Sequence, residues 1–254
     1  WMAGEEWVLD VFRGDGKMYE RNAASIYNMN VEHVGKNSHE RFVGKVAELA
    51  LGYQGGHRAF LQMASAYRVD ISQPEAERAK MAWRAARPKI EAFWHEIERV
   101  SLVATRNPGT KVSMEGHPHG VMFLKRGSFL FCKLPSGRVL VYPYPEIIQK
   151  ETPWGELRPA LTYMGVDPRT RKWTRLDSYG GKLTENVVQA TCRDLLSHAM
   201  VATEGLRNCR VVFSVPEDDG PTMKAFQHAM TSLPDWAKGL PMDASCWTGK
   251  RYRK

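Results

Sequence analysis

The sequence predicts an α+β fold in which a helical region, residues 1–105, precedes a region with an antiparallel sheet, residues 106–254. Three observations support this prediction. Apolar side chains recur at helical intervals up to about residue 105. The segment Arg106-Asn-Pro-Gly109 then interrupts the pattern. After it, short runs of β-formers alternate with turn sequences such as Pro135-Ser-Gly137, which is typical of hairpins.

Helix start and stop signals divide the first region. Residues 3–13 place Trp7, Val8, Val11 and Phe12 on one helical face, and a second helix is predicted near residues 18–27. Ser38 is the predicted N-cap of a helix that we expect to continue to Gly55-Gly56. Further helices are predicted for residues 57–69, 75–86 and 88–104. Their predicted core residues are Trp83, Ile90, Phe93, Trp94 and Ile97.

Strands are predicted in the second region at residues 120–124, 128–134 and 138–142. A hairpin of residues 161–165 and 173–176 is expected to turn at Asp167-Pro-Arg-Thr170. The helix predicted for residues 186–203 has an apolar face of Val187, Val188, Cys192, Leu195, Leu196 and Ala199. A strand at 210–215 and a last helix at 222–233 follow, and Trp236, Leu240 and Trp247 are expected to pack the final residues onto the sheet.

Composition favours a globular protein with a polyanionic partner. The 254 residues carry a formal net charge of +8, spread along the chain. The four cysteines stand far apart and His117 and His119 lack further ligands, so neither a disulfide framework nor a zinc site is indicated. No apolar run approaches membrane-spanning length, and no signal peptide is visible. We therefore expect reduced thiols, no membrane partner and a cytoplasmic location.

Four residues recur every four positions in the helix after Ser38: Arg41, Lys45, Leu49 and Tyr53. This spacing places them in one stripe, opposite an apolar face of Val43, Val46, Ala47, Ala50 and Leu51. A solvated Arg/Lys face is the commoner origin of such a stripe. The alternative is a site for a nucleoside triphosphate, in which the cations bind phosphate oxygens while the apolar and aromatic side chains meet sugar and base.

The stripe resembles motif B, the fingers helix of family A DNA polymerases, especially the phage type. Other segments resemble that family in the same order along the chain: Trp1-Met-Ala-Gly-Glu-Glu-Trp7, Leu134-Pro-Ser-Gly-Arg138, residues 179–194, Leu240-Pro241 and Gly249 to Lys254. The resemblance thus covers nearly the whole chain. It implies helical fingers for residues 1–105 and half of an antiparallel-sheet palm for residues 106–254, an incomplete right-hand polymerase fold.

The resemblance also implies roles for particular residues in template-directed DNA synthesis. Arg41 and Lys45 would bind the deoxynucleoside triphosphate, and Lys45 would protonate or neutralise the leaving pyrophosphate. Tyr53 and Leu49 would shape the nascent base pair, and Tyr19 occupies the approximate place of a phosphate- or base-contacting residue. The residues implied to contact primer-template DNA are Glu185, Gln189, Arg193 and Arg138.

Family A polymerases use two Mg²⁺ ions held by two aspartates, one in motif A and one in motif C. Motif A falls upstream of the equivalent of Trp1, and the sequence Val215-Pro-Glu-Asp-Asp219 replaces the expected His-Asp-Glu turn. Asp218 and Asp219 follow a proline that fixes a turn, so we do not expect them to substitute. A fragment or internally deleted form is therefore expected, which needs the missing N-terminal polymerase segment as a partner and extends primers slowly or not at all by itself.

Two other functions stay open on this evidence. One is a non-catalytic nucleic-acid-binding remnant of a polymerase, which would bind DNA in a salt-dependent way without any nucleotide dependence. The other is a relative of single-subunit RNA polymerases, which share motif B in outline. The sequence Gly180-Gly-Lys-Leu-Thr-Glu-Asn186 favours the DNA enzymes. If the gene is phage-encoded, the expected location is the cytoplasm of a bacterial host.

Overall fold

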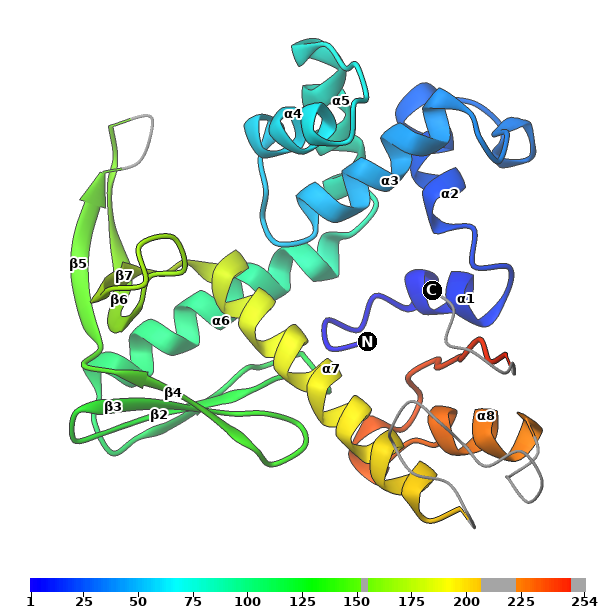
Figure 1. Cartoon of the computed structure of the whole chain (residues 1–254). Helices are drawn as coiled ribbons and strands as arrows, with labels where there is room; N and C mark the ends of the chain where they lie inside the picture. The colour runs from blue at the N-terminus through cyan, green and yellow to red at the C-terminus, as the bar shows by residue number, and fades with distance from the viewer. Residues whose placement is uncertain (152–154, 207–222, 248–254) are drawn as a thin grey trace. The chain divides into compact units, whose positions relative to one another are not determined.

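A computed structural model describes residues 1–151, 155–206 and 223–247 (Figure 1). It combines helices with antiparallel sheets, which confirms the predicted α+β class. The chain divides into two compact units, residues 1–187 and 188–254, and each is described by itself. Within the first unit the change from helices to strands falls between Arg106 and Lys111. The assignment of residues 1–105 to fingers and of 106–254 to a palm stays a prediction.

Six α-helices and one short 3₁₀-helix are described before the first strand. Their bounds are α1 (Glu6–Arg13), α2 (Met18–Tyr27), η1 (Val31–His33), α3 (His39–Leu51), α4 (His57–Ala66), α5 (Gln73–Ala85) and α6 (Pro88–Arg106). The predicted N-cap of α3 is confirmed, because Ser38 accepts a hydrogen bond from the Arg41 N–H at 3.2 Å. α5 begins at Gln73, slightly before the predicted residues 75–86, and Ser72 and Glu75 form a capping box that was not predicted. In α1 the predicted apolar face is wrong at Phe12, which is 55% exposed, while Leu9 is buried.

The core of the helical region lies beneath α3. All five residues of its predicted apolar face are buried, and they pack with Phe60 of α4 and with Trp83 and Trp94. The predicted end of α3 is wrong, because the helix stops at Leu51 and Tyr53 lies in the turn to α4. Trp94 Nε1 donates to the carbonyl of Gly52 at 3.2 Å, and Gln54 adopts a left-handed φ of 63°. These contacts close the helix before Gly55-Gly56.

In the described part of the chain, seven strands form two antiparallel sheets. The first has the order β1 (Lys111–Ser113), β2 (Met122–Arg126), β3 (Phe129–Lys133), β4 (Val139–Pro143), and the second has the order β5 (Glu146–Glu151), β6 (Leu157–Val166), β7 (Trp173–Asp177). The five predicted strands among the described residues are confirmed. The sequence did not predict β1 and β5, because β1 has three residues and β5 is mostly polar and exposed.

Helix α7 (Gly180–Glu204) begins before the predicted Asn186. Gly180 and Gly181 are helical residues at a close packing contact, since a Cβ at Gly180 would lie 2.0 Å from the Trp94 carbonyl oxygen. The predicted apolar face is wrong at Cys192 and Leu196, which are exposed. The residues buried along α7 include Leu183, Val187, Thr191, Leu195 and Ala199.

The second unit also contains α8 (Met223–Thr231) and η2 (Asp235–Ala237). α8 confirms the predicted last helix. The predicted strand 210–215, together with Asp218 and Asp219, lies outside the described residues. Among the described residues, no helix combines the length and the apolar character needed to cross a membrane.

Candidate functional site

Helices α2 and α3 lie side by side and pack closely against each other (Figure 1). Gly44 makes this approach possible, because a Cβ there would lie 2.1 Å from the Tyr19 carbonyl oxygen. The Asn22 amide donates to the Gly44 carbonyl at 3.1 Å and ties the two backbones together. The first turn of α2 is thereby held beside the first turn of α3, which brings Tyr19 and Glu20 to Arg41.

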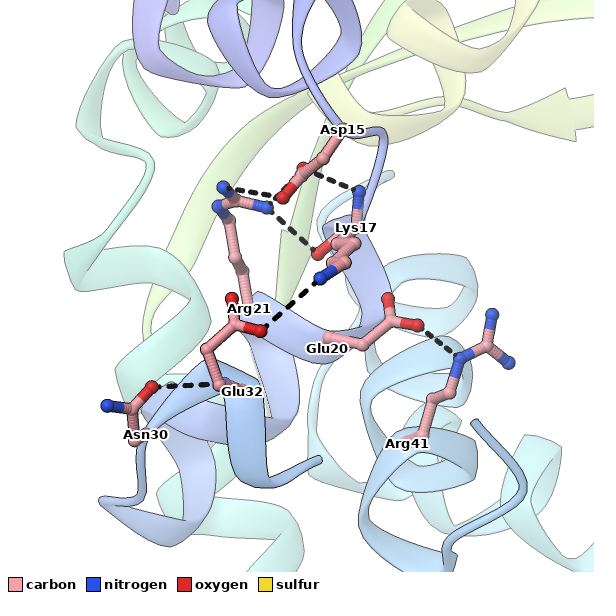
Figure 2. Close-up of polar contacts among 7 residues, drawn as sticks. All are labelled: Asp15, Lys17, Glu20, Arg21, Asn30, Glu32 and Arg41. Atoms are coloured by element: carbon pink, nitrogen blue, oxygen red, sulfur yellow. Dashed lines mark hydrogen bonds and ion pairs between the residues drawn. The ribbon is translucent and has the colours of Figure 1, made fainter. Parts of the chain in front are cut away.

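Arg41 is held by two residues of α2. Its Nε donates to Glu20 Oε1 at 2.5 Å (Figure 2), and its guanidinium carbon lies 5.4 Å from the centroid of the Tyr19 ring. Burial is the largest single effect on Glu20 and opposes its ionisation. The hydrogen bond and charge of Arg41, together with a backbone hydrogen bond and the charge of Lys17, outweigh burial, so the pKa of Glu20 is lowered. The structure therefore brings together two predicted nucleotide-binding residues, Tyr19 and Arg41.

The terminal nitrogens of Arg41 remain available to a ligand. Only Nε is engaged by Glu20, and neither terminal nitrogen has a hydrogen-bond partner among the described residues. The side chain is 25% exposed, so these nitrogens are within reach of solvent. A guanidinium in this state can donate two parallel hydrogen bonds to a phosphate or carboxylate group.

Lys45 lies one turn further along α3 and makes a weaker contact. Its Nζ is 5.4 Å from the centroid of the Tyr67 ring, and Tyr67 is itself 49% exposed. Such a contact contributes about 0.5–1 kcal/mol at an exposed site. An anionic ligand can therefore replace the Tyr67 ring as the partner of the Lys45 ammonium group. Leu49, on the next turn, is 41% exposed. Arg41 and Lys45, both half-buried, and the exposed Leu49 thus share one face of α3, while Tyr53 is displaced into the following turn.

Short polar contacts fix the start of α2 (Figure 2). Asp15 in the α1–α2 connection accepts hydrogen bonds from the Lys17 N–H at 3.0 Å and from Arg21 at 2.7 Å. Glu32 of η1 pairs with Lys17 at 3.6 Å. Because these contacts span the turn before Glu20, they limit the movement of the carboxylate that holds Arg41.

A buried ion pair supports α3 from its other side. Arg87 is 1% exposed and donates to Glu48 at 2.9 Å and to Asn22 at 2.7 Å. Its guanidinium carbon also lies near two indoles, 4.9 Å from the Trp7 centroid and 4.5 Å from the Trp83 centroid. Burial lowers the pKa of Arg87 against the raising effect of Glu48. Removing Glu48 would leave the buried charge of Arg87 without its acidic partner.

Sequence reasoning missed Glu20, Glu48 and Arg87. Glu48 is a carboxylate next to the buried positions of α3, and this break in the apolar pattern was the available signal for a buried ion pair. Glu20 follows the predicted Tyr19, but its partner is 21 positions away. No local pattern predicts such a pairing.

The residues implied to contact DNA lie on other elements. Glu185, Gln189 and Arg193 are at i, i+4 and i+8 of α7, half-buried in the first case and exposed in the other two. Arg138 directly precedes β4, and its N–H donates to Ser136 Oγ at 3.3 Å. The described residues contain no group of three or more His, Cys, Asp or Glu placed to hold a metal ion. DNA contact by these four residues stays a prediction.

Comparison with known proteins finds similarity along the whole chain. A curated protein named DNA polymerase, from Bacillus phage SP02, is 40% identical over 261 residues. The match covers 100% of this chain and 39% of the relative, so the chain spans about two fifths of the relative's length. No family model matches.

Proposed function

We propose that this chain is the nucleotide- and template-binding part of a DNA polymerase that adds deoxynucleotides to a primer 3′ end. The observation that carries the proposal is the partly exposed cationic face of α3 in a chain 40% identical, over its whole length, to a phage DNA polymerase. The finer assignment to the phage type of family A rests on the resemblance of the Arg41 to Tyr53 motif and of the segments around it.

The arrangement of Arg41 and Lys45 suits a triphosphate. Glu20 occupies Arg41 Nε and leaves the two terminal nitrogens to grip phosphate oxygens in a bidentate manner. Lys45 adds a positive charge one turn away, which can neutralise or protonate the leaving pyrophosphate. Leu49, Tyr53 and Tyr19 then supply apolar and aromatic surface for sugar and base.

The resemblance also implies Mg²⁺, and the described residues do not fit that group. They contain no cluster of metal-ligating side chains, and Asp218 and Asp219 lie outside them. The proposal therefore assigns no metal ligand and derives no step through magnesium. Within the proposal, the side chains that hold the primer-template are Glu185, Gln189, Arg193 and Arg138.

Nucleotide titration of variants tests the proposal. Lys45→Ala and Arg41→Ala should each weaken deoxynucleoside triphosphate binding about tenfold or more, because a charge-assisted phosphate contact is lost. Primer-template affinity should change less than about threefold, because DNA spreads its contacts over many phosphates. The matched control is Arg58→Ala, which removes an exposed cation from the neighbouring helix α4.

Two outcomes would contradict this assignment. Equal losses of triphosphate and DNA affinity in Lys45→Ala would show that Lys45 is a general contact for polyanions. Salt-dependent DNA binding by the unmodified chain, with no triphosphate binding, would support the non-catalytic alternative instead.

A further inference from the structure

The turn between β6 and β7 has a closed internal hydrogen-bond network. Asp167 Oδ1 accepts from the N–H of Arg169 at 3.0 Å, from the N–H of Thr170 at 2.7 Å and from the Thr170 hydroxyl at 3.0 Å. The backbone of Asp167 bonds to that of Arg171 at 2.8 Å and to that of Lys172 at 2.9 Å. The turn therefore keeps its shape without contacts from other elements.

Three cations project from this turn: Arg169, Arg171 and Lys172 are all exposed. Among the described residues none of them has an ion-pair partner. With the Asp167 carboxylate, whose oxygen is engaged by the turn itself, residues 167–172 carry a net charge of +2. A cluster of unneutralised cations on a fixed turn is suited to a polyanion.

The rest of the same sheet shows the opposite arrangement. Lys150 pairs with Asp177, Arg158 with Glu156 at 2.7 Å, and Arg175 with Glu146 at 2.7 Å. The positive charge of this sheet is thus locally neutralised along β5, β6 and β7, whereas the three cations of the turn have no acidic partner in the part of the chain that the structure describes.

An exposed aromatic ring adjoins the turn. Trp173 is 57% exposed, and its cross-strand partner Val166 is 54% exposed. Both residues lie on the face of the sheet that also carries Arg175. Proteins bind single strands by stacking an aromatic ring on a base and by contacting phosphates with cations. The solvent-exposed indole of Trp173 and the neighbouring cations of the turn supply both features.

We propose that the β6–β7 turn is a binding site for single-stranded DNA. Arg169, Arg171 and Lys172 contact successive phosphates, and Trp173 stacks on an unpaired base. This inference rests on the proposed function, since a polymerase must handle template that is not yet paired. It adds a contact outside α3 and α7.

The charge contribution is tested with the full chain and a labelled oligothymidylate of about twelve nucleotides. The variant Arg169→Gln/Arg171→Gln/Lys172→Gln should bind about tenfold or more weakly at low salt, and its slope of log affinity against log salt should be shallower by about 2. The control Lys150→Gln/Arg158→Gln/Arg99→Gln removes the same formal charge from three exposed paired cations. It should change the affinity less than about threefold.

The stacking contribution is tested with Trp173→Leu and an abasic strand of equal length. This variant should bind oligothymidylate about fivefold more weakly and the abasic strand as the unmodified chain does. Equal losses on both strands, or a turn variant that binds like the unmodified chain, would overturn the inference. If the unmodified chain binds no DNA, the proposed function fails too. If the turn variants bind oligothymidylate as the unmodified chain does while Lys45→Ala weakens triphosphate binding, the inference fails and the proposed function stands.

Discussion

At the residue scale, Glu20 determines which nitrogens of Arg41 are free to bind a ligand and how the arginine side chain is oriented. A carboxylate beside a phosphate-binding arginine can act in two ways, as a competitor of the ligand or as a support for the arginine. Here it bonds to Nε, on the inner edge of the guanidinium, and both terminal nitrogens stay available. Support is therefore the better explanation, because the arginine is already ordered before the ligand arrives.

Replacing Glu20 tests this explanation. Glu20→Ala should weaken triphosphate binding about threefold to tenfold, because Arg41 must then lose its side-chain freedom on binding. Glu20→Gln should lie between this variant and the unmodified chain, since an amide oxygen can still accept from Nε. Isothermal titration with a deoxynucleoside triphosphate gives the affinities, and Asp70→Asn, which removes an exposed acid between α4 and α5, is the control. Tighter binding by Glu20→Ala would show competition instead.

The lowered pKa of Glu20 gives a pH-dependent prediction. A carboxylate whose pKa is lowered by folding contributes stability above its unfolded value, and this stability is lost as the pH falls through the folded pKa. The ordinary value is 4.5, so the difference in unfolding free energy between the unmodified chain and Glu20→Gln should be full above about pH 5 and shrink below it. Urea unfolding between about pH 3.5 and pH 7 measures it. A constant difference would contradict the ion pair.

At the element scale, the close contact of α2 with α3 determines where Tyr19 and Glu20 lie relative to Arg41. Gly44→Ala places a methyl group 2.1 Å from the Tyr19 carbonyl oxygen and 2.9 Å from the Ala23 nitrogen, so the helices must separate. We expect a loss of about 1–3 kcal/mol in unfolding free energy, together with weaker triphosphate binding because Tyr19 and Glu20 move from Arg41. Thermal and urea unfolding check the first effect, and titration checks the second.

Gly35→Ala is the matched control. A Cβ there would meet only Ser38 Cβ at 3.6 Å, an ordinary contact distance. Its stability should stay within about 0.5 kcal/mol of the unmodified chain. Equal stability of Gly35→Ala and Gly44→Ala would mean that the helices do not pack as closely as described.

Local signals predicted most elements, and they failed where two distant segments meet. The apolar face of α3 and its Ser38 cap follow from helical spacing and from one side chain, so both could be predicted. The end of α3 and the start of α7 could not. The Gly181 N–H donates to the Gln54 side chain at 2.8 Å, and a Cβ at Gly181 would lie 2.2 Å from the Tyr53 carbonyl oxygen. A glycine required by such packing looks the same in sequence as one that ends a helix.

The candidate site was predictable to a similar extent. Arg41, Lys45 and Leu49 share one partly exposed face because they are one turn apart, and spacing alone predicts this. The ion pair between Arg87 and Glu48 joins residues 39 positions apart. It depends on how α3 packs against the α5–α6 junction, which no local pattern specifies.

At the scale of the whole molecule, the net charge of +8 predicts a polyanionic partner but not where it binds. Many arginines are neutralised by nearby acids, as Arg13 is by Glu6 and Asp10, and Arg99 by Glu96. Exposed surface pairs of this kind contribute little to binding DNA. Lys45 and the cations of the β6–β7 turn have no acidic partner within the described ranges, so they are more informative than the total charge.

These two sites use different residues on different elements, so their binding energies should be independent. Lys45→Ala should weaken triphosphate binding only, and Arg169→Gln/Arg171→Gln/Lys172→Gln should weaken oligothymidylate binding only. In the combined variant each loss should stay within about twofold of its value in the separate variant, because distant sites without shared partners are additive. Titrations of all four proteins with both ligands measure the coupling. A combined loss that departs from the separate losses by about tenfold would show that nucleotide and single strand share one surface.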